Sequence, residues 1–160
     1  MGYHQILTIA SIFLLSMLIL NVNNATTERL TSMYSNESVI SASGIAQSLI
    51  DEIQTKCFDE MTRNNVVLTT DSLTQVKFLG KDGGESFSTQ FDDIDDYNNY
   101  TKTDILNRMG EFNAKVRVYY IDKTKPDLES TVSTFTKRID VQVTNFSLPD
   151  TLTFSHIIGY

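Results

Sequence analysis

The sequence has one cysteine and two histidines, and this scarcity excludes several classes of protein. A single thiol cannot build an intrachain disulfide framework, and Cys57, His4 and His156 are too few for a zinc-finger array. The CxxCH sequence for covalent haem attachment does not occur. Two prolines and seven glycines in 160 residues are also too few for a collagen-like or low-complexity chain. The length suits one domain with its own core.

Basic residues are outnumbered, with 13 Lys and Arg against 20 Asp and Glu, for a net charge of −7. A nucleic-acid-binding surface needs a clustered basic excess, which this balance does not provide. The sequence also lacks a glycine-rich phosphate loop and a Gly-x-Ser-x-Gly nucleophile frame. The lone Cys57 and the two histidines have no spaced partner that would activate them. We therefore expect no enzymatic activity, no small-molecule substrate and no nucleic-acid partner.

Charged side chains are missing altogether from residues 1–27, which contain an apolar run from Ile6 to Val22. As a helix this run would span about 25 Å, slightly less than the roughly 30 Å hydrocarbon core of a bilayer. Three interpretations compete: a cleaved signal peptide, a permanent membrane anchor, and a helix that leaves the membrane for a protein assembly. The signal peptide is disfavoured because a basic start and an A-x-A cleavage site are lacking.

Residues 26–61 continue without proline, and their apolar residues recur in steps of three and four. This spacing predicts an amphipathic helix. The stripe consists of Leu30, Met33, Tyr34, Ala42, Ile45, Ala46, Leu49, Ile50, Ile53, Cys57 and Met61. Cys57 is expected to act as a small buried hydrophobe. The combined helix would be apolar all round in its first half and would pack one face on a globular head in its second.

Beyond Arg63 the apolar residues alternate with a period of two, which is typical of strands. Two short strands are predicted at 65–70 and 75–79, and three longer ones at 112–120, 135–143 and 152–160. Each long strand has one apolar face, and His156 falls on that of the last strand as a packed histidine. An antiparallel sheet covered on one side by the helix is therefore expected.

These patterns predict an α+β fold in which a long N-terminal helix, part apolar stalk and part amphipathic, packs on a C-terminal antiparallel sheet. Residues 1–25 would form the apolar helix for a membrane or a filament core. Residues 26–160 would form the head, with the amphipathic helix at 26–61 and the sheet at 65–160.

Much of the acidity lies in residues 82–104, where seven acidic residues face Lys102 alone. Asp92, Asp93, Asp95 and Asp96 offer oxygens that suit Ca²⁺, but their spacing is not that of an EF-hand loop. The alternative is a solvated turn whose side chains cap nearby backbone amides, and this is the favoured interpretation. We expect no cofactor other than a candidate Ca²⁺ ion at these four residues.

The segment from Phe91 to Tyr100 reads FDDIDDYNNY. Together with the charge-free helix, its amphipathic extension and the C-terminal strands, it resembles the type IV pilins and pseudopilins. The ten-residue stretch is similar to a segment of some minor pilins, notably of the mannose-sensitive haemagglutinin type, where it likewise precedes three strands. The resemblance covers the whole chain in architecture and only this stretch in sequence.

The resemblance implies a lollipop-shaped subunit of an extracellular filament on the cell surface, inserted in the cytoplasmic membrane before assembly. Its implied partners are copies of itself, the membrane and a pilus or secretion assembly machinery. The helix residues expected to make the filament contacts are Tyr3, Gln5, Ile9, Ile12, Phe13, Leu14, Met17, Leu18 and Leu20. Pilins carry a glutamate at the fifth mature position. Gln5 would stand there if Met1 is the first mature residue, and Leu7 if processing falls between Gly2 and Tyr3.

Two other functions stay open at this point. The chain could be a minor pseudopilin that primes or tips a pilus or a type II secretion filament. It could also be a single-pass, membrane-anchored binding domain that never polymerises. Of the four N-x-S/T sequons, those at Asn99 and Asn145 are the better glycosylation candidates, because the other two lie on the predicted stalk.

Overall fold

The computed structural model describes residues 2–160 of the chain. Helix α1 (Gly2–Gln54) is followed by strands β1 (Thr101–Leu106), β2 (Gly110–Asp122), β3 (Lys125–Glu129), β4 (Thr136–Thr144) and β5 (Leu152–Gly159). The chain divides into two compact units, the first ending at Glu37 and the second covering Ser38–Tyr160, and α1 contributes to both. The predicted α+β fold, with a long N-terminal helix packed on an antiparallel sheet, is confirmed.

In the first unit, α1 is helical throughout in spite of its many hydroxyl residues. Thr8, Ser11 and Ser16 donate hydrogen bonds to backbone carbonyls three or four residues earlier, at 2.8–3.1 Å. Thr26 and Thr31 do the same further along the helix. Because these hydroxyls are satisfied by the helix itself, they do not require water or another side chain.

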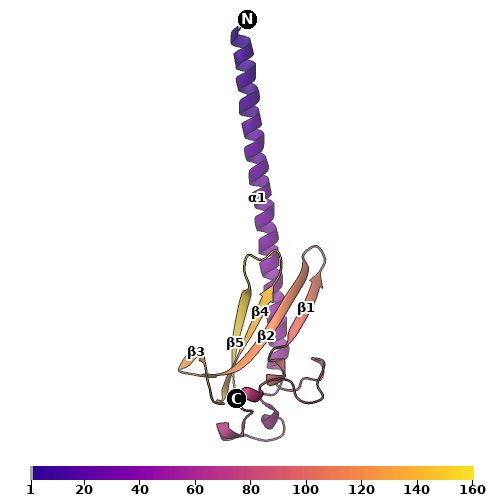
Figure 1. Cartoon of the computed structure of the whole chain (residues 1–160), viewed down its shortest axis with the longest axis vertical. Coiled ribbons are helices and arrows are strands. Elements are labelled where there is room, and N and C mark those ends of the chain that lie inside the picture. The colour runs from indigo at the N-terminus through magenta and orange to yellow at the C-terminus, as the bar shows by residue number, and fades with distance from the viewer. Residues whose placement is uncertain (1) are drawn as a thin grey trace. The chain divides into compact units, whose positions relative to one another are not determined.

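In the second unit, the residues of α1 from Ser38 onward turn one face to the sheet, as Figure 1 shows for the part of α1 beside the labelled strands. The residues buried on this face are Ser38, Ala42, Ala46, Leu49, Ile50 and Ile53. The predicted stripe is confirmed for this part of the helix. It is wrong for Leu30, Met33 and Tyr34, which are exposed because they lie ahead of the part of α1 that the sheet covers.

The helix ends at Gln54, so the predicted end at residue 61 is wrong. Cys57 leaves the helix to form a parallel bridge with Asp93, in which its N–H donates to the Asp92 carbonyl at 3.1 Å. Two residues later, Asp59 caps a 3₁₀ turn at Glu60–Thr62 and forms a capping box with Thr62. Cys57 has left the helix at this point and is only half-buried.

The sheet has the order β1-β2-β4-β5, every pair is antiparallel, and β3 pairs with the far end of β2. Figure 1 shows these strands side by side. The three long predicted strands correspond to β2, β4 and β5 within two residues at each end. The core is built where their apolar faces meet α1. It includes Phe112, Ala114, Val116 and Val118 of β2 and Ile139, Val141 and Val143 of β4.

The start of the predicted sheet is wrong, because pairing begins at Thr101 and not at residue 65. Residues 65–69 form no helix or strand, and a 3₁₀ turn begins at Thr70 (Thr70–Ser72); residues 75–79 contain the 3₁₀ turn Val76–Phe78 in place of a strand. In this region Val67 and Leu73 are buried in the core, whereas Val66 and Leu68 are exposed. Burial of single side chains from an irregular segment therefore produced a pattern that resembles a strand. Strands β1 and β3 were not predicted, because their sequences, TKTDIL and KPDLE, do not alternate apolar and polar residues.

Candidate functional site

The predicted filament contacts form an exposed apolar surface on the first unit. Gln5 is exposed, and the eight apolar residues range from 54% exposed at Met17 to 85% at Tyr3. Ile12 to Leu15 are four consecutive residues, and each is at least 56% exposed. Consecutive helix residues point about 100° apart, so this surface surrounds α1 completely and does not form a stripe.

A helix of this length and composition is apolar enough to cross a membrane. The N-terminal part of α1 could therefore anchor the chain in a bilayer. Thr8, Ser11 and Ser16 do not oppose this, because their hydroxyls are already hydrogen bonded to the helix backbone.

The acidic loop in the second unit is buried, so its interpretation as a solvated turn is wrong. Asp93, Asp95 and Asp96 are each at most 3% exposed. The amide-capping part of that interpretation is correct, since Asp96 Oδ2 accepts from the Asp92 and Asp93 N–H groups at 3.1 and 3.2 Å. Phe91 and Tyr97 bury the loop in the core and pack edge to face, 4.9 Å apart. Because Phe91 and Tyr97 lie in the core, the aspartates between them are buried as well.

The four aspartates do not converge on one point. Carboxylate oxygens of Asp92 and Asp96 lie within 4.8 Å of one another and of a carboxylate oxygen of Glu85, which was not among the predicted ligands. Asp93 Oδ1 accepts from the Asp96 N–H, and Asp95 turns to a lysine. Burial and the neighbouring Asp96 and Asp92 raise the pKa of Glu85 to about 7. Oxygen ligands of this kind suit Ca²⁺, and the binding of this ion stays a prediction.

The lysine is Lys137 on β4, which is completely buried. Its Nζ donates to the Phe58 carbonyl at 2.6 Å, to Asp59 Oδ2 at 3.2 Å and to Asp95 Oδ1. The rings of Phe58 and Tyr120 lie against the same nitrogen, with centroids at 4.5 and 5.0 Å. The sequence carried a signal for this site, because Lys137 occupies an apolar-face position in the alternation of its strand.

Asp59 lies at the centre of this buried cluster. Its carboxylate accepts from the Met61 N–H, from the Thr74 N–H and hydroxyl, and from the Tyr120 hydroxyl at 2.9 Å. Burial by itself would raise the pKa of Asp59, but the charge of Lys137 and these hydrogen bonds lower it overall. Asp95 differs, because the effect of burial on its pKa is larger than the opposite effect of the Lys137 charge. The pKa of Asp95 is therefore raised to about 6.

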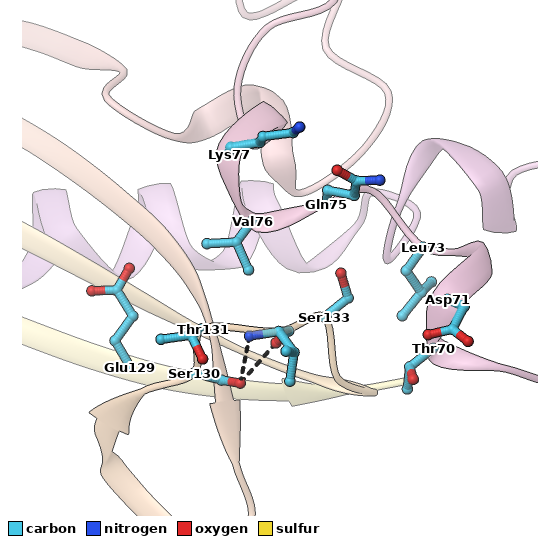
Figure 2. A pocket seen from close by; sticks show the side chains of 11 residues that line it. Thr70, Asp71, Leu73, Gln75, Val76, Lys77, Glu129, Ser130, Thr131 and Ser133 are labelled. Atoms are coloured by element: carbon cyan, nitrogen blue, oxygen red, sulfur yellow. Dashed lines mark hydrogen bonds between the residues drawn. The ribbon is translucent and has the colours of Figure 1, made fainter.

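An open groove of about 1150 Å³ lies on the surface of the second unit. Residues from Thr70 to Lys77 line one side, and residues from Glu129 to Ser133 line the other, as Figure 2 shows. Ser130 Oγ bonds to the backbone of Val132 within the second wall. The lining mixes apolar, hydroxyl and charged side chains, and it brings together none of the site residues predicted from the sequence.

The two glycosylation candidates differ in their surroundings. Asn99 is exposed and adopts a positive φ of 63°. Asn145 is half-buried, and its Nδ2 donates to the carbonyls of Met109 and Glu111 at 2.9 and 2.8 Å. A glycan on Nδ2 of Asn145 would replace one of these hydrogen bonds, so Asn99 is the better placed acceptor.

Comparison of the chain with protein-family models, with curated proteins and with solved structures gave no match.

Asp93 gives the loop an unusual pH dependence. Burial, Asp95 and Asp96 raise the pKa of Asp93 to about 8, so the folded protein holds a proton that the unfolded chain releases near pH 4. The stabilisation from this proton is complete below about pH 4 and is lost as the pH rises to about 8. We expect the free energy of unfolding to fall by at least about 1 kcal/mol between pH 5 and pH 8.

The Asp93→Asn variant tests this assignment, because the amide oxygen can still accept from the Asp96 N–H but cannot titrate. Urea unfolding of both proteins at several pH values should show a flatter pH profile for Asp93→Asn. An unchanged slope in the variant would show that Asp93 does not carry the effect.

Proposed function

We propose that this chain is the structural subunit of an extracellular, pilus-like filament that polymerises through α1. The observation that supports the proposal is the apolar surface all round the helix, from Tyr3 to Val22. Removing a large apolar side chain from water stabilises a protein by about 1.5–3 kcal/mol. A helix apolar on every side therefore has to remain in lipid or be surrounded by other helices.

A bundle of identical helices would meet this requirement once the helix leaves the bilayer. Copies of the chain are then the main partners, with the membrane before assembly and an assembly machinery that extracts the subunit. Leu30, Met33 and Tyr34 continue the exposed apolar surface beyond the length that a bilayer needs. Lateral contacts between helices would cover these residues, whereas a simple anchor would leave them in water.

The β-strands of the second unit would remain outside the bundle and face the surroundings. The chain has features that suit this role, since β2, β4 and β5 alternate buried and exposed residues along much of their length. Residues of α1 from Ser38 onward cover the buried face. The outer face carries Asn, Thr, Gln and Lys side chains, such as Lys115 and Gln142.

Replacement of a small residue in the apolar segment separates the filament from a monomeric anchor. Ala10→Phe stays apolar, so we expect normal partition into membranes. Close packing of neighbouring helices leaves little room for the larger ring, and we expect a several-fold decrease in sheared filaments. Quantitative blotting of the membrane and sheared fractions measures both. Unchanged filament yield would contradict a tightly packed bundle at this position.

A matched control is Leu15→Phe, which adds a ring at a position that is already large. It should reduce filament yield less than Ala10→Phe, because the change in volume is smaller.

A further inference from the structure

The buried cluster around Lys137 places an amine, a carboxyl group and a second carboxylate in direct contact. Nζ of Lys137 contacts Oδ1 of Asp95, and Asp59 Oδ2 lies 3.2 Å from the same nitrogen. The side chains of Lys137, Asp59 and Asp95 are 0%, 0% and 3% exposed. The three groups come from β4, from the segment after α1 and from the 3₁₀ turn at Asp95–Tyr97. The fold therefore holds together reactive groups that are distant in the sequence.

The ionised form of this cluster is costly, because three charges share one desolvated site. One ammonium faces two carboxylates, so the cluster keeps a net charge of −1 in the interior. Asp95 Oδ2 is also buried and, among residues 2–160, has no hydrogen-bond partner. An unsatisfied buried carboxylate oxygen is rare and requires an explanation. Transfer of one proton from Lys137 to Asp95 gives an amine beside a carboxylic acid, and it removes two of the three charges from the desolvated site.

We propose that Lys137 and Asp95 condense to form an intramolecular amide bond, and that Asp59 transfers the proton for this step. The neutral Nζ attacks Cγ of Asp95, a C–N bond forms, and the C–O bond to one carboxyl oxygen breaks. Asp59 accepts a proton from the attacking nitrogen and delivers it to the departing oxygen, which leaves as water. Asp59 ends as the carboxylate that it was at the start. The reaction consumes no other reagent and involves no oxidation or reduction.

The surroundings of the cluster suit each part of this step. Tyr120, Thr74 and Met61 fix the Asp59 carboxylate by hydrogen bonds, so it is held beside the nitrogen. The rings of Phe58 and Tyr120 cover the amine and exclude water, which would otherwise reverse the condensation. In the product, the remaining N–H can donate to the Phe58 carbonyl or to Asp59. One buried ion pair is replaced by a neutral amide.

The bond would join the acidic loop to the sheet across 42 residues of sequence. A covalent link that closes a loop reduces the entropy of the unfolded chain and so raises stability. The link would therefore hold the loop on the sheet independently of whether the chain polymerises.

Mass spectrometry of the whole chain, purified in detergent and denatured, tests the bond directly. We expect the mass of the chain to be lower by one water molecule than the mass calculated for the linear, unlinked chain. Trypsin should not cleave after Lys137, because its amine is blocked. The digest should contain a branched peptide in which residues 82–102 are joined to residues 124–138. Recovery of a linear peptide 82–102 and of cleavage after Lys137 as the main products would overturn the proposal.

Two variants separate the roles of the residues. Lys137→Arg removes the amine, and it should yield the linear peptide 82–102 and the full mass. Asp59→Asn removes the proton carrier but keeps an acceptor oxygen, and it should give mainly the unlinked chain. Asp104→Asn is the matched control, because it removes a carboxylate that pairs with Lys102 outside the cluster, and it should remain linked. A fully linked Asp59→Asn chain would refute the role given to Asp59, and an unlinked Asp104→Asn chain would refute the role given to the cluster.

Discussion

Leu14→Asp is expected to abolish filament formation. Leu14 is 65% exposed on the isolated chain and lies in the middle of the apolar segment. In a bundle it would be surrounded by apolar side chains of neighbouring copies. An unpaired carboxylate buried there costs several kcal/mol for each subunit, and the cost recurs along the filament. Electron microscopy of the sheared fraction measures the outcome, and filaments at wild-type abundance would contradict the buried bundle.

Leu68→Asp is the matched control for this substitution. It introduces the same carboxylate in place of the same side chain, but Leu68 is 84% exposed on the second unit and lies outside every helix and strand. Surface substitutions of this kind change stability by about 0.5 kcal/mol or less. Leu68→Asp should therefore assemble normally. Loss of filaments in both variants would mean that the effect of Leu14→Asp is not specific to the helix.

Asp59→Ala is expected to have the largest effect on the stability of the second unit. The substitution leaves the N–H groups of Met61 and Thr74 and the hydroxyl of Tyr120 without their acceptor, and it removes a charge from beside Lys137. Removing one member of a buried ion pair costs about 3–5 kcal/mol. Where the proposed Lys137–Asp95 amide has formed, Lys137 carries no charge, and the decrease then comes from the donors left without an acceptor and from loss of the amide. Urea unfolding, followed by near-ultraviolet circular dichroism of the tyrosines, measures the change.

Asp127→Ala provides the comparison for this effect. Asp127 also pairs with a basic residue, Arg138, but its side chain is 92% exposed. Exposed ion pairs contribute at most about 1 kcal/mol, so the midpoint of unfolding should scarcely move. An equal decrease in the free energy of unfolding for Asp59→Ala and Asp127→Ala would show that the buried cluster contributes no more to stability than a surface ion pair.

Much of the fold could be predicted because its helix and long strands have clear periodicity. The change from an all-round apolar segment to one apolar face distinguished the two parts of α1. Strict alternation placed β2, β4 and β5 within two residues. The errors lie where a single local interaction decides the structure. The Asp59 cap and the bridge of Cys57 to Asp93 end the helical path, although the apolar spacing continues to Met61.

The buried cluster could be predicted only in part, because its members are far apart in the sequence. Lys137 falls at an apolar-face position of its strand, which is a signal for a buried cation, but no prediction was drawn from it and it does not identify the partners. Asp95 lies in a segment so acidic that exposure to water is the ordinary expectation. Its burial depends on Phe91 and Tyr97, which reach the core and draw the loop inward. Pairing of Asp59 and Asp95 with one lysine is a property of the tertiary structure.

Electron cryomicroscopy of filaments sheared from cells that produce this chain shows directly whether α1 forms a filament core. We predict filaments composed of this chain, with residues 3–22 of α1 packed against other copies in the core and the β-strands outside. A preparation that contains the chain only as monomers or in membrane vesicles, with no filaments, would contradict this prediction.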